Sequence, residues 1–223
     1  MKPKYSIIIP TKNEEDTIAH VLYNIPNEIK KNSEIIVADS SDDLTPLIAR
    51  SFGAIIIKVK SGGKGKAVRI AVGKSRGDIL IFLDGDGTDP PTYIPHLLKK
   101  LEDCHLVLGC RDQKKTKDNL DKMLFLIYKF GFVSPFLKKF NKLGLNVSDP
   151  LAGFRTIRKS DFKRLDLQSN NFELETEMNI KALNLGFKIG IVPIPVNLRE
   201  NSIFKSKLLL NPKELIKIIK LSS

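Results

Sequence analysis

Tryptophan is absent from this 223-residue chain, which contains only four tyrosines, three histidines and two cysteines. So few stacking side chains argue against a surface for single-stranded nucleic acid, although the formal net charge is +12. A basic nucleic-acid-binding protein therefore remains only as the non-enzymatic alternative. Cys104 and Cys110 form neither a Cys-x-x-Cys pair nor a metal cluster, so we expect unpaired thiols in a cytosolic protein. The three isolated histidines are interpreted as structural.

Long apolar runs are also missing from the sequence. No stretch reaches the roughly 18 residues that indicate a transmembrane helix. The first residues lead directly into a predicted strand, so we expect no signal peptide. The excess of 37 basic over 25 acidic residues favours an anionic partner, which is a nucleic acid, a phosphorylated substrate or an anionic membrane surface.

Two common nucleotide-binding signatures are absent as well. The glycine-rich stretch 61–67 lacks the Gly-x-x-x-x-Gly-Lys-Ser/Thr spacing of a P-loop, and no Gly-x-Gly-x-x-Gly turn follows the first predicted strand. A dinucleotide-binding dehydrogenase is therefore not expected. The backbone amides of this stretch, together with Lys64, could bind a phosphate at a helix N-terminus. A solvated turn is an equally good interpretation.

What the sequence does contain is an alternation of short apolar runs with helical patterns. We predict strands over 5–9, 34–38, 54–59 and 78–83, and helices over 14–25, up to 53, over 64–75 and after Pro90. This order predicts an α/β fold with a mainly parallel central sheet and helices on both faces. We expect one domain, 1–223, made of a half 1–110 and a half 111–223. The second half should contain a turn-rich stretch over 147–154, a helix over 172–185 that ends at Gly186, an extended edge segment over 188–196 and a terminal helix over 212–221.

Carboxylates follow three of the predicted strands. The loops are 10–15, 39–43 and the turn Asp84-Gly85-Asp86. Because the carboxyl ends of parallel strands share one edge of a sheet, these loops should lie together, where such sheets bind ligands. Carboxylates with substrate phosphates are the ligands that Mg²⁺ prefers. The alternatives are helix capping by Asn13 or Asp42 and an ordinary acidic turn.

These segments resemble family 2 glycosyltransferases. The resemblance is carried by Ser-Ile-Ile-Ile-Pro-Thr-Lys-Asn-Glu-Glu, Ile-Ile-Val-Ala-Asp-Ser-Ser-Asp-Asp, Gly-Lys-Gly-Lys-Ala and Asp-Ile-Leu-Ile-Phe-Leu-Asp-Gly-Asp-Gly. The later Asp-Pro-Leu-Ala-Gly-Phe-Arg, at 149–155, is similar to an acceptor-side motif of the dolichol-phosphate mannose synthase branch. So are Val192-Pro193-Ile194, Arg199 and Ser206-Lys207-Leu208.

The resemblance implies a GT-A type fold with a Rossmann-like sugar-nucleotide-binding half and an acceptor-binding half. It implies a Mg²⁺ or Mn²⁺ ion held by Asp84 and Asp86, which with Arg199 form the catalytic set. It further implies a donor site made of Pro10, Thr11, Glu14, Asp39, Lys64 and Asp84. Arg111, Arg155, Arg199 and Lys207 are candidates for the acceptor phosphate or for the leaving diphosphate, since the guanidinium fork matches phosphate geometry.

Three positions depart from the pattern of the family. Ala38 stands where many relatives have the first of two aspartates, and Thr88 stands where the mannose synthase branch often has a glutamine near the metal. The gap between Arg199 and Lys207 is longer than usual, so Lys205 is an alternative to Lys207. These departures bear on the choice of sugar and acceptor.

The implied reaction is the inverting transfer of a hexose to dolichyl or polyprenyl phosphate. GDP-mannose is the leading donor, UDP-glucose is the alternative, and a non-catalytic scaffold that binds sugar nucleotide is a third hypothesis. The Lys-flanked apolar segment 119–142 is predicted to form interfacial helices on an anionic membrane, with a buried core helix as the alternative. We therefore expect peripheral attachment to the cytoplasmic face of a membrane, or a separate transmembrane subunit.

Overall fold

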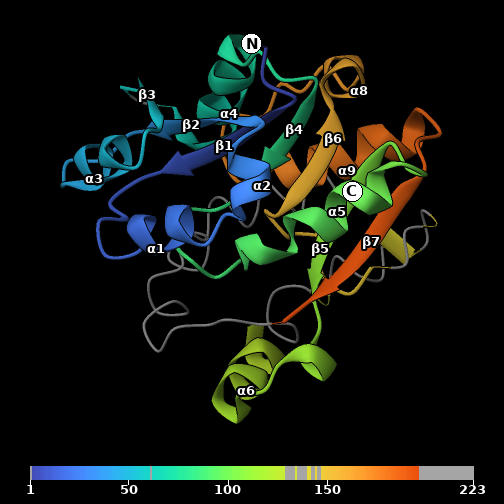
Figure 1. The fold of residues 1–223 in the computed structure, drawn as a ribbon. Helices are drawn as coiled ribbons and strands as arrows, with labels where there is room; N and C mark the ends of the chain where they lie inside the picture. Colours follow the sequence, from blue (N-terminus) through green and yellow to red (C-terminus); the bar gives the residue numbers. More distant parts are fainter. Residues whose placement is uncertain are drawn as a thin grey trace.

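The computed structural model describes residues 2–60, 62–128, 134, 140–141, 144 and 147–195. Among these residues, seven strands form one sheet in the order β3-β2-β1-β4-β6-β5-β7 (Figure 1). The strands are β1 (Tyr5–Thr11), β2 (Ser33–Asp39), β3 (Ile55–Lys58), β4 (Ile79–Phe82), β5 (Leu106–Arg111), β6 (Arg155–Arg158) and β7 (Ile189–Ile194).

The sheet is mainly parallel, as predicted. β1 pairs in parallel with β2 and β4, β2 with β3, and β5 with β7. Only β6, among the described strands, runs antiparallel to its neighbours β4 and β5. Because β6 is reversed, its first residue, Arg155, lies beside Phe82 at the carboxyl end of β4. The reversal brings the segment before β6 to the rim where the parallel strands end.

Helices cover both faces of the sheet (Figure 1). They are α1 (Ile18–Tyr23), α2 (Asn27–Lys30), α3 (Thr45–Ser51), α4 (Gly63–Lys74), α5 (Ile94–Leu101), α6 (Asn119–Tyr128), α8 (Lys159–Arg164) and α9 (Leu174–Asn184), with short 3-10 turns η1 (Pro91–Tyr93) and η2 (Gln113–Lys115). One core lies under α4, α8 and α9 and includes Ile8, whereas its neighbour Ile7 belongs to the other core, under α1, α2, α3 and α5. This alternation is the consequence of the two-residue period of a strand.

Some boundaries and elements differ from the prediction. The helix expected over 14–25 begins only at Ile18, because residues before it form a turn in which Asn13 has a φ of 56°. β5, β6 and α8 lie where the sequence patterns predict no element. The end of α9 agrees with the prediction, since Gly186 follows it with a φ of 68°, and β7 lies at the sheet edge as expected.

None of the described helices is both long and apolar enough to cross a bilayer. Of the segment 119–142, the structure describes α6, which projects from the lower end of the body in Figure 1, and the isolated positions 134, 140 and 141. The predicted terminal helix over 212–221, together with Arg199, Lys205 and Lys207, lies outside the described residues.

Candidate active site at the carboxyl ends of β1, β2 and β4

The three acidic loops lie side by side at one rim of the sheet, as the strand order requires. The Thr11 hydroxyl donates a 3.0 Å hydrogen bond to Oδ1 of Asp39, which links the ends of β1 and β2. The Thr17 hydroxyl donates a 2.7 Å bond to the carbonyl of Gly85, which joins the first loop to the Asp84-Gly85-Asp86 turn. Gly85 is needed here, because a Cβ atom would lie 2.8 Å from Cγ2 of Thr11.

Asn13 and Glu14 connect the first two loops through their backbone amides. The amide of Asn13 donates to Oγ of Ser41, and the amide of Glu14 donates to Oγ1 of Thr45, each over 2.8 Å. The side chain of Asn13 accepts a bond from the amide of Asp42 and makes no capping bond to α1. The capping alternative for Asn13 is therefore not supported.

Asp39 is completely buried at the end of β2. Its Oδ1 atom accepts bonds from Thr11 and from the amide of Ser41, and its Oδ2 atom lies 3.0 Å from Nζ of Lys58. Both oxygens of this carboxylate are therefore already engaged, and the side chain of Lys58 is largely exposed.

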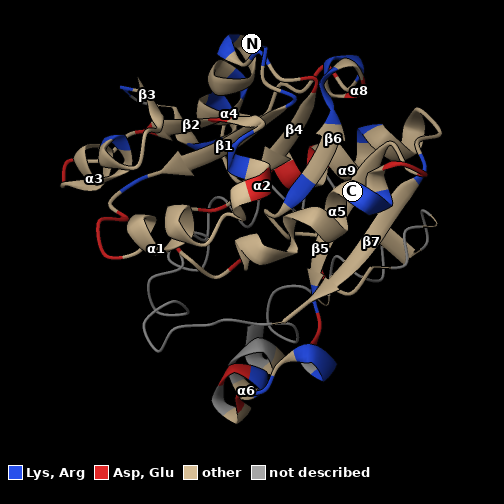
Figure 2. Ribbon diagram, in the orientation of Figure 1, with Lys and Arg blue, Asp and Glu red and all other residues tan. Residues whose placement is uncertain are grey.

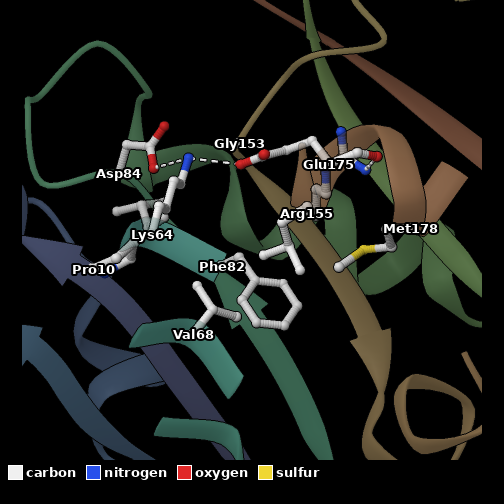
Figure 3. Close-up of a pocket in the computed structure, with 11 residues that line it drawn as sticks. Pro10, Lys64, Val68, Phe82, Asp84, Gly153, Arg155, Glu175 and Met178 are labelled. Carbon is white, nitrogen blue, oxygen red and sulfur yellow. Dashed lines mark hydrogen bonds and ion pairs between the residues drawn. The ribbon is translucent and has the colours of Figure 1, made fainter. Parts of the chain in front are cut away.

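Asp84 forms an ion pair with Lys64, which comes from the first turn of α4. The ammonium lies 2.7 Å from Oδ1 of Asp84 and 2.7 Å from Oε1 of Glu175 on α9 (Figure 3). Burial acts to lower the pKa of Lys64, but the two carboxylates outweigh it and hold that pKa above its ordinary value. Lys64 is therefore a charged group that joins elements from both halves of the chain.

Asp86 is held in a tight turn at the half-buried rim. Its Oδ1 atom accepts a 3.0 Å bond from the amide of Thr88 and a 2.8 Å bond from the hydroxyl of Thr88. The Thr88 hydroxyl is therefore engaged with Asp86 itself. Position 88 in this chain therefore orients the carboxylate of Asp86.

Asp89 is buried to 1% exposure, and neither of its carboxylate oxygens has a hydrogen-bond partner among the described residues. Burial raises the pKa of Asp89 to about 7, in the same direction as the charges of Asp84 and Asp86 and against that of Arg111. A buried carboxylate in this condition, beside two others, marks the turn as a place that favours a cation.

The motif 149–155 is a buried turn beneath the rim rather than a surface for an acceptor. Arg155 is only 1% exposed and donates to the carbonyls of Pro150, Ala152 and Glu175 and to Oδ1 of Asn179. This placement does not support the expected contact of Arg155 with the acceptor phosphate. The guanidinium instead fixes the turn, whose Gly153 faces Asp84.

Arg111, at the end of β5, lies 3.0 Å by its Nε atom from Oδ2 of Asp149. Asp149 is fully buried, and the Arg111 side chain retains 12% exposure. Arg111 also faces Asp89 electrostatically. The motif thus has a second structural function, because its first residue, Asp149, holds Arg111 in place. Arg111 is more exposed than Arg155, the other described arginine of the predicted acceptor set.

The described part of the glycine-rich stretch packs on one side against the loop 169–171, although Gly62 and Gly63 are exposed. The amide of Lys66 donates to the carbonyl of Asn170, and Gly63 and Gly65 are packed so tightly against 169–171 that a Cβ atom would clash at either position. A loop from the second half therefore already occupies the amide of Lys66 in the first turn of α4. Lys64 is the residue of this stretch that turns toward the site (Figure 3).

Comparison with known proteins identifies this arrangement. The family described as "Glycosyl transferase family 2" matches residues 6–166. The chain is 31% identical over 193 residues to a dolichyl-phosphate hexose transferase of Haloferax volcanii, which covers 85% of this chain and 81% of that protein. This protein belongs to glycosyltransferase family 2.

Two further comparisons extend this result. The glycosyltransferase is 28% identical over 214 residues to an undecaprenyl-phosphate mannosyltransferase of Micrococcus luteus, covering 90% of the chain and 86% of that relative. Its fold matches a glucosyl-3-phosphoglycerate synthase of Mycobacterium tuberculosis, solved with Mn²⁺ and UDP, with a TM-score of 0.77 at 23% identity over 98% of this chain and 78% of that one. The predicted GT-A type fold and the enzyme class are confirmed.

The charges around Asp84 fit a divalent cation, because an ammonium already occupies one of its oxygens and Asp89 lies nearby without a hydrogen-bond partner among the described residues. Within the part of the chain that the structure describes, no three His, Cys, Asp or Glu side chains converge to make a complete metal site. A metal at this turn would need further ligands besides Asp84 and Asp86, and Mg²⁺ commonly takes such ligands from substrate phosphates.

Sequence reasoning missed Glu175, which pairs with Lys64, and Asp89, which is buried beside Asp84 and Asp86. Asp89 follows closely on the predicted metal turn, so its position was an available signal. Glu175 lies among other glutamates at the start of a helix and gave no signal of its own.

A narrow cavity at Lys64 is lined by Pro10, Lys64, Val68, Phe82, Leu83, Asp84, Gly153, Arg155, Leu174, Glu175 and Met178.

Proposed function

We propose that this glycosyltransferase transfers a hexose from a sugar nucleotide to a polyprenyl phosphate, with a Mg²⁺ or Mn²⁺ ion held by Asp84 and Asp86. The observation that carries the proposal is the acidic rim at the ends of β1, β2 and β4, where Asp84 already binds a cationic group. It is supported by relatives whose names specify dolichyl-phosphate and undecaprenyl-phosphate acceptors.

GDP-mannose is the proposed donor, and UDP-glucose is the alternative. Mannose is supported by the names of the Micrococcus luteus relative and of a dolichol-phosphate mannosyltransferase from Pyrococcus furiosus, 29% identical over 188 residues, which covers 80% of this chain and 53% of that relative. Pro10, Thr11, Glu14 and Asp39 are proposed to line the nucleoside pocket, because they belong to the loops that end β1 and β2.

The chemistry follows from charge. A lipid phosphate is already an anion near neutral pH, so the chain has to bring two anions together rather than supply a strong base. When bound, the metal supplies Lewis acidity to the donor diphosphate. Arg111 is the described arginine that can orient the acceptor phosphate for in-line attack on the anomeric carbon, held by Asp149. Arg199 and Lys207, or Lys205, remain proposed acceptor contacts. Attack from the face opposite the leaving diphosphate inverts the anomeric centre.

Attachment to a membrane surface is proposed for α6. Met123 and Leu126 lie three residues apart on this helix and are 51% and 39% exposed, although both are apolar. Lys114 and Lys115 precede the helix and Lys122 lies on it. Figure 2 shows basic segments on and beside α6, together with acidic ones. This combination is typical of an interfacial helix on anionic lipid. A separate transmembrane subunit remains a proposed partner.

The membrane proposal is tested by co-sedimentation with liposomes that contain phosphatidylglycerol. The double variant Met123→Glu/Leu126→Glu should bind at least about fivefold more weakly, since each charge opposes burial in the interface. Leu47→Glu is the matched control, because Leu47 is a 61% exposed leucine on α3. Equal liposome binding by both variants would show that α6 does not contact the membrane.

The transfer reaction is tested with radiolabelled GDP-mannose and UDP-glucose, each offered with dolichyl phosphate or with 3-phosphoglycerate as a water-soluble acceptor. We expect label in the lipid fraction in the presence of Mg²⁺ or Mn²⁺ and none after chelation. Asp86→Ala should lower turnover at least about a hundredfold, because the metal contributes several kcal/mol. The exposed Asp103→Ala is the control. Turnover that persists in the presence of the chelator would contradict the proposed metal dependence. Transfer to 3-phosphoglycerate alone would contradict the proposed lipid acceptor.

A further inference from the structure

The ammonium of Lys64 occupies the position at Asp84 that a metal would need. It lies 2.7 Å from Oδ1 of Asp84, which is direct contact distance (Figure 3). A divalent ion on the same oxygen would place two cations within a few ångströms in a half-buried site, where their repulsion is much stronger than in water. Lys64 and the metal therefore compete for Asp84.

Asp84 has little freedom to avoid this competition. A Cβ atom on Gly153 would overlap Oδ2 of Asp84 and would lie 3.1 Å from its Oδ1, so the carboxylate rests directly against the Gly153 backbone. Arg155 fixes that backbone through the carbonyls of Pro150 and Ala152. The carboxylate is thus held between a rigid turn on one side and Lys64 on the other.

Lys64 nevertheless keeps a partner when Asp84 is taken. Its second carboxylate, Glu175, is only 6% exposed, and the backbone carbonyl of the same residue accepts a 3.1 Å bond from Nη1 of Arg155. The ring of Phe172 lies 5.9 Å from the ammonium. Lys64 can therefore leave Asp84 without becoming an unpaired buried charge.

We propose that Lys64 is an internal counter-ion that holds Asp84 until the metal and the donor diphosphate arrive, and that Glu175 is the positioning residue that retains the displaced ammonium beside the diphosphate. This inference rests on the proposed function for the identity of the donor. It makes metal binding and donor binding cooperative, since metal alone has to displace Lys64 while metal with diphosphate offers the ammonium a new anion.

The two residues should then affect metal affinity in opposite directions. Lys64→Met removes the competing cation and should tighten Mn²⁺ binding in the absence of nucleotide by roughly tenfold, within the usual range of such couplings. Glu175→Gln weakens the second partner, biases Lys64 toward Asp84 and should weaken Mn²⁺ binding. Electron paramagnetic resonance of free Mn²⁺ measures both constants on the full chain, without turnover.

Two further variants control for folding and for total charge. Lys64→Met/Glu175→Gln removes both charges, so that Glu175 is not left as an orphaned buried carboxylate, and it should still bind Mn²⁺ more tightly than the wild type. Lys66→Met loses the same charge from an exposed position in the same turn and should change the affinity by less than about twofold. With UDP or GDP added, the advantage of Lys64→Met should shrink or reverse, because the ammonium is then an attractive contact.

Unchanged or weaker Mn²⁺ binding by both Lys64 variants would overturn the proposal, as would shifts of the same sign in Lys64→Met and Glu175→Gln. The proposed reaction is judged separately by transfer of labelled sugar in the wild type. If the two variants shift the Mn²⁺ affinity in opposite directions but the wild type transfers no sugar to lipid, the counter-ion role of Lys64 stands and the lipid acceptor is rejected. If the wild type transfers sugar to lipid but these affinity shifts are absent, the lipid acceptor stands and the counter-ion role of Lys64 is rejected.

Discussion

The guanidinium of Arg155 donates a 2.7 Å hydrogen bond to Oδ1 of Asn179, and the side-chain amide of Asn179 donates in turn to the carbonyl of Pro150. The two side chains join the start of β6 to α9 and enclose the turn 149–155, almost entirely out of contact with solvent. A polar network of this kind is stabilising only while every member is satisfied. This network fixes the turn that carries Gly153, and Gly153 lies against the carboxylate of Asp84.

Arg155→Lys should lower the free energy of unfolding by roughly 2–4 kcal/mol, because one ammonium cannot replace the several bonds of the guanidinium in a buried site. Urea denaturation measures the change. Arg50→Lys is the control, since Arg50 is exposed on α3 and should change stability by less than about 0.5 kcal/mol. A similar small loss in both variants would mean that the network contributes little.

Gly153→Ala should disturb the site while leaving the fold intact. The new methyl group would overlap Oδ2 of Asp84 and push the carboxylate aside. We expect Mn²⁺ binding and sugar transfer to fall roughly tenfold or more, in keeping with the sensitivity of metal sites to the orientation of their ligands. Circular dichroism should be unchanged. Wild-type affinity and turnover in this variant would show that Asp84 does not need its observed position.

Gly65→Ala and Gly73→Ala lie on the same helix and should have opposite effects. A Cβ atom at Gly65 would overlap the backbone carbonyl of Ser169, so we expect a loss of roughly 1–3 kcal/mol. At Gly73 nothing described lies within 4 Å, and alanine should stabilise the helix by about 0.5–1 kcal/mol. Thermal unfolding compares the two. Equal stability would show that the loop over α4 moves away at no cost.

Stability should depend on pH in opposite ways at two buried carboxylates. Although burial acts to raise the pKa of Glu34, hydrogen bonds from Arg76, Ser6 and Gly77 hold that pKa below its usual value. Glu34 therefore stabilises the fold above its unfolded pKa, and this contribution is lost as the pH falls through the folded pKa. Glu34→Gln should cost roughly 1–2 kcal/mol at pH 7 and little near pH 3, as measured by urea denaturation. An equal cost at both pH values would contradict this.

Asp89 shows the reverse behaviour, because burial raises its pKa to about 7. Its stabilising contribution is complete below the unfolded pKa of about 4 and is lost as the pH rises through about 7. Asp89→Asn should therefore stabilise the metal-free protein by up to a few kcal/mol at about pH 8, with no gain near pH 4. Denaturant titrations at the two pH values measure this, and a variant that is less stable than the wild type at the higher pH would contradict it.

Much of the rim could be predicted from the amino-acid sequence. Four short apolar runs that alternate with helical patterns allow few arrangements, and a parallel order places the loops after 5–9, 34–38 and 78–83 at one edge. The placement of Arg155 differs from the expectation. Its motif was interpreted as a surface for phosphate, and a lone arginine in a turn does not reveal whether its donors face solvent or carbonyl groups.

Local periodicity and short motifs in the chain are enough to establish the α/β class, the sequence family and the position of Asp84 and Asp86 at a strand end. Three features are visible only in the folded chain: Lys64 bridges Asp84 and Glu175, Asn170 bonds the first turn of α4, and β6 runs antiparallel between β4 and β5. The reason is that burial and ion pairing depend on which distant segments are packed together, and no local pattern in the chain records that choice.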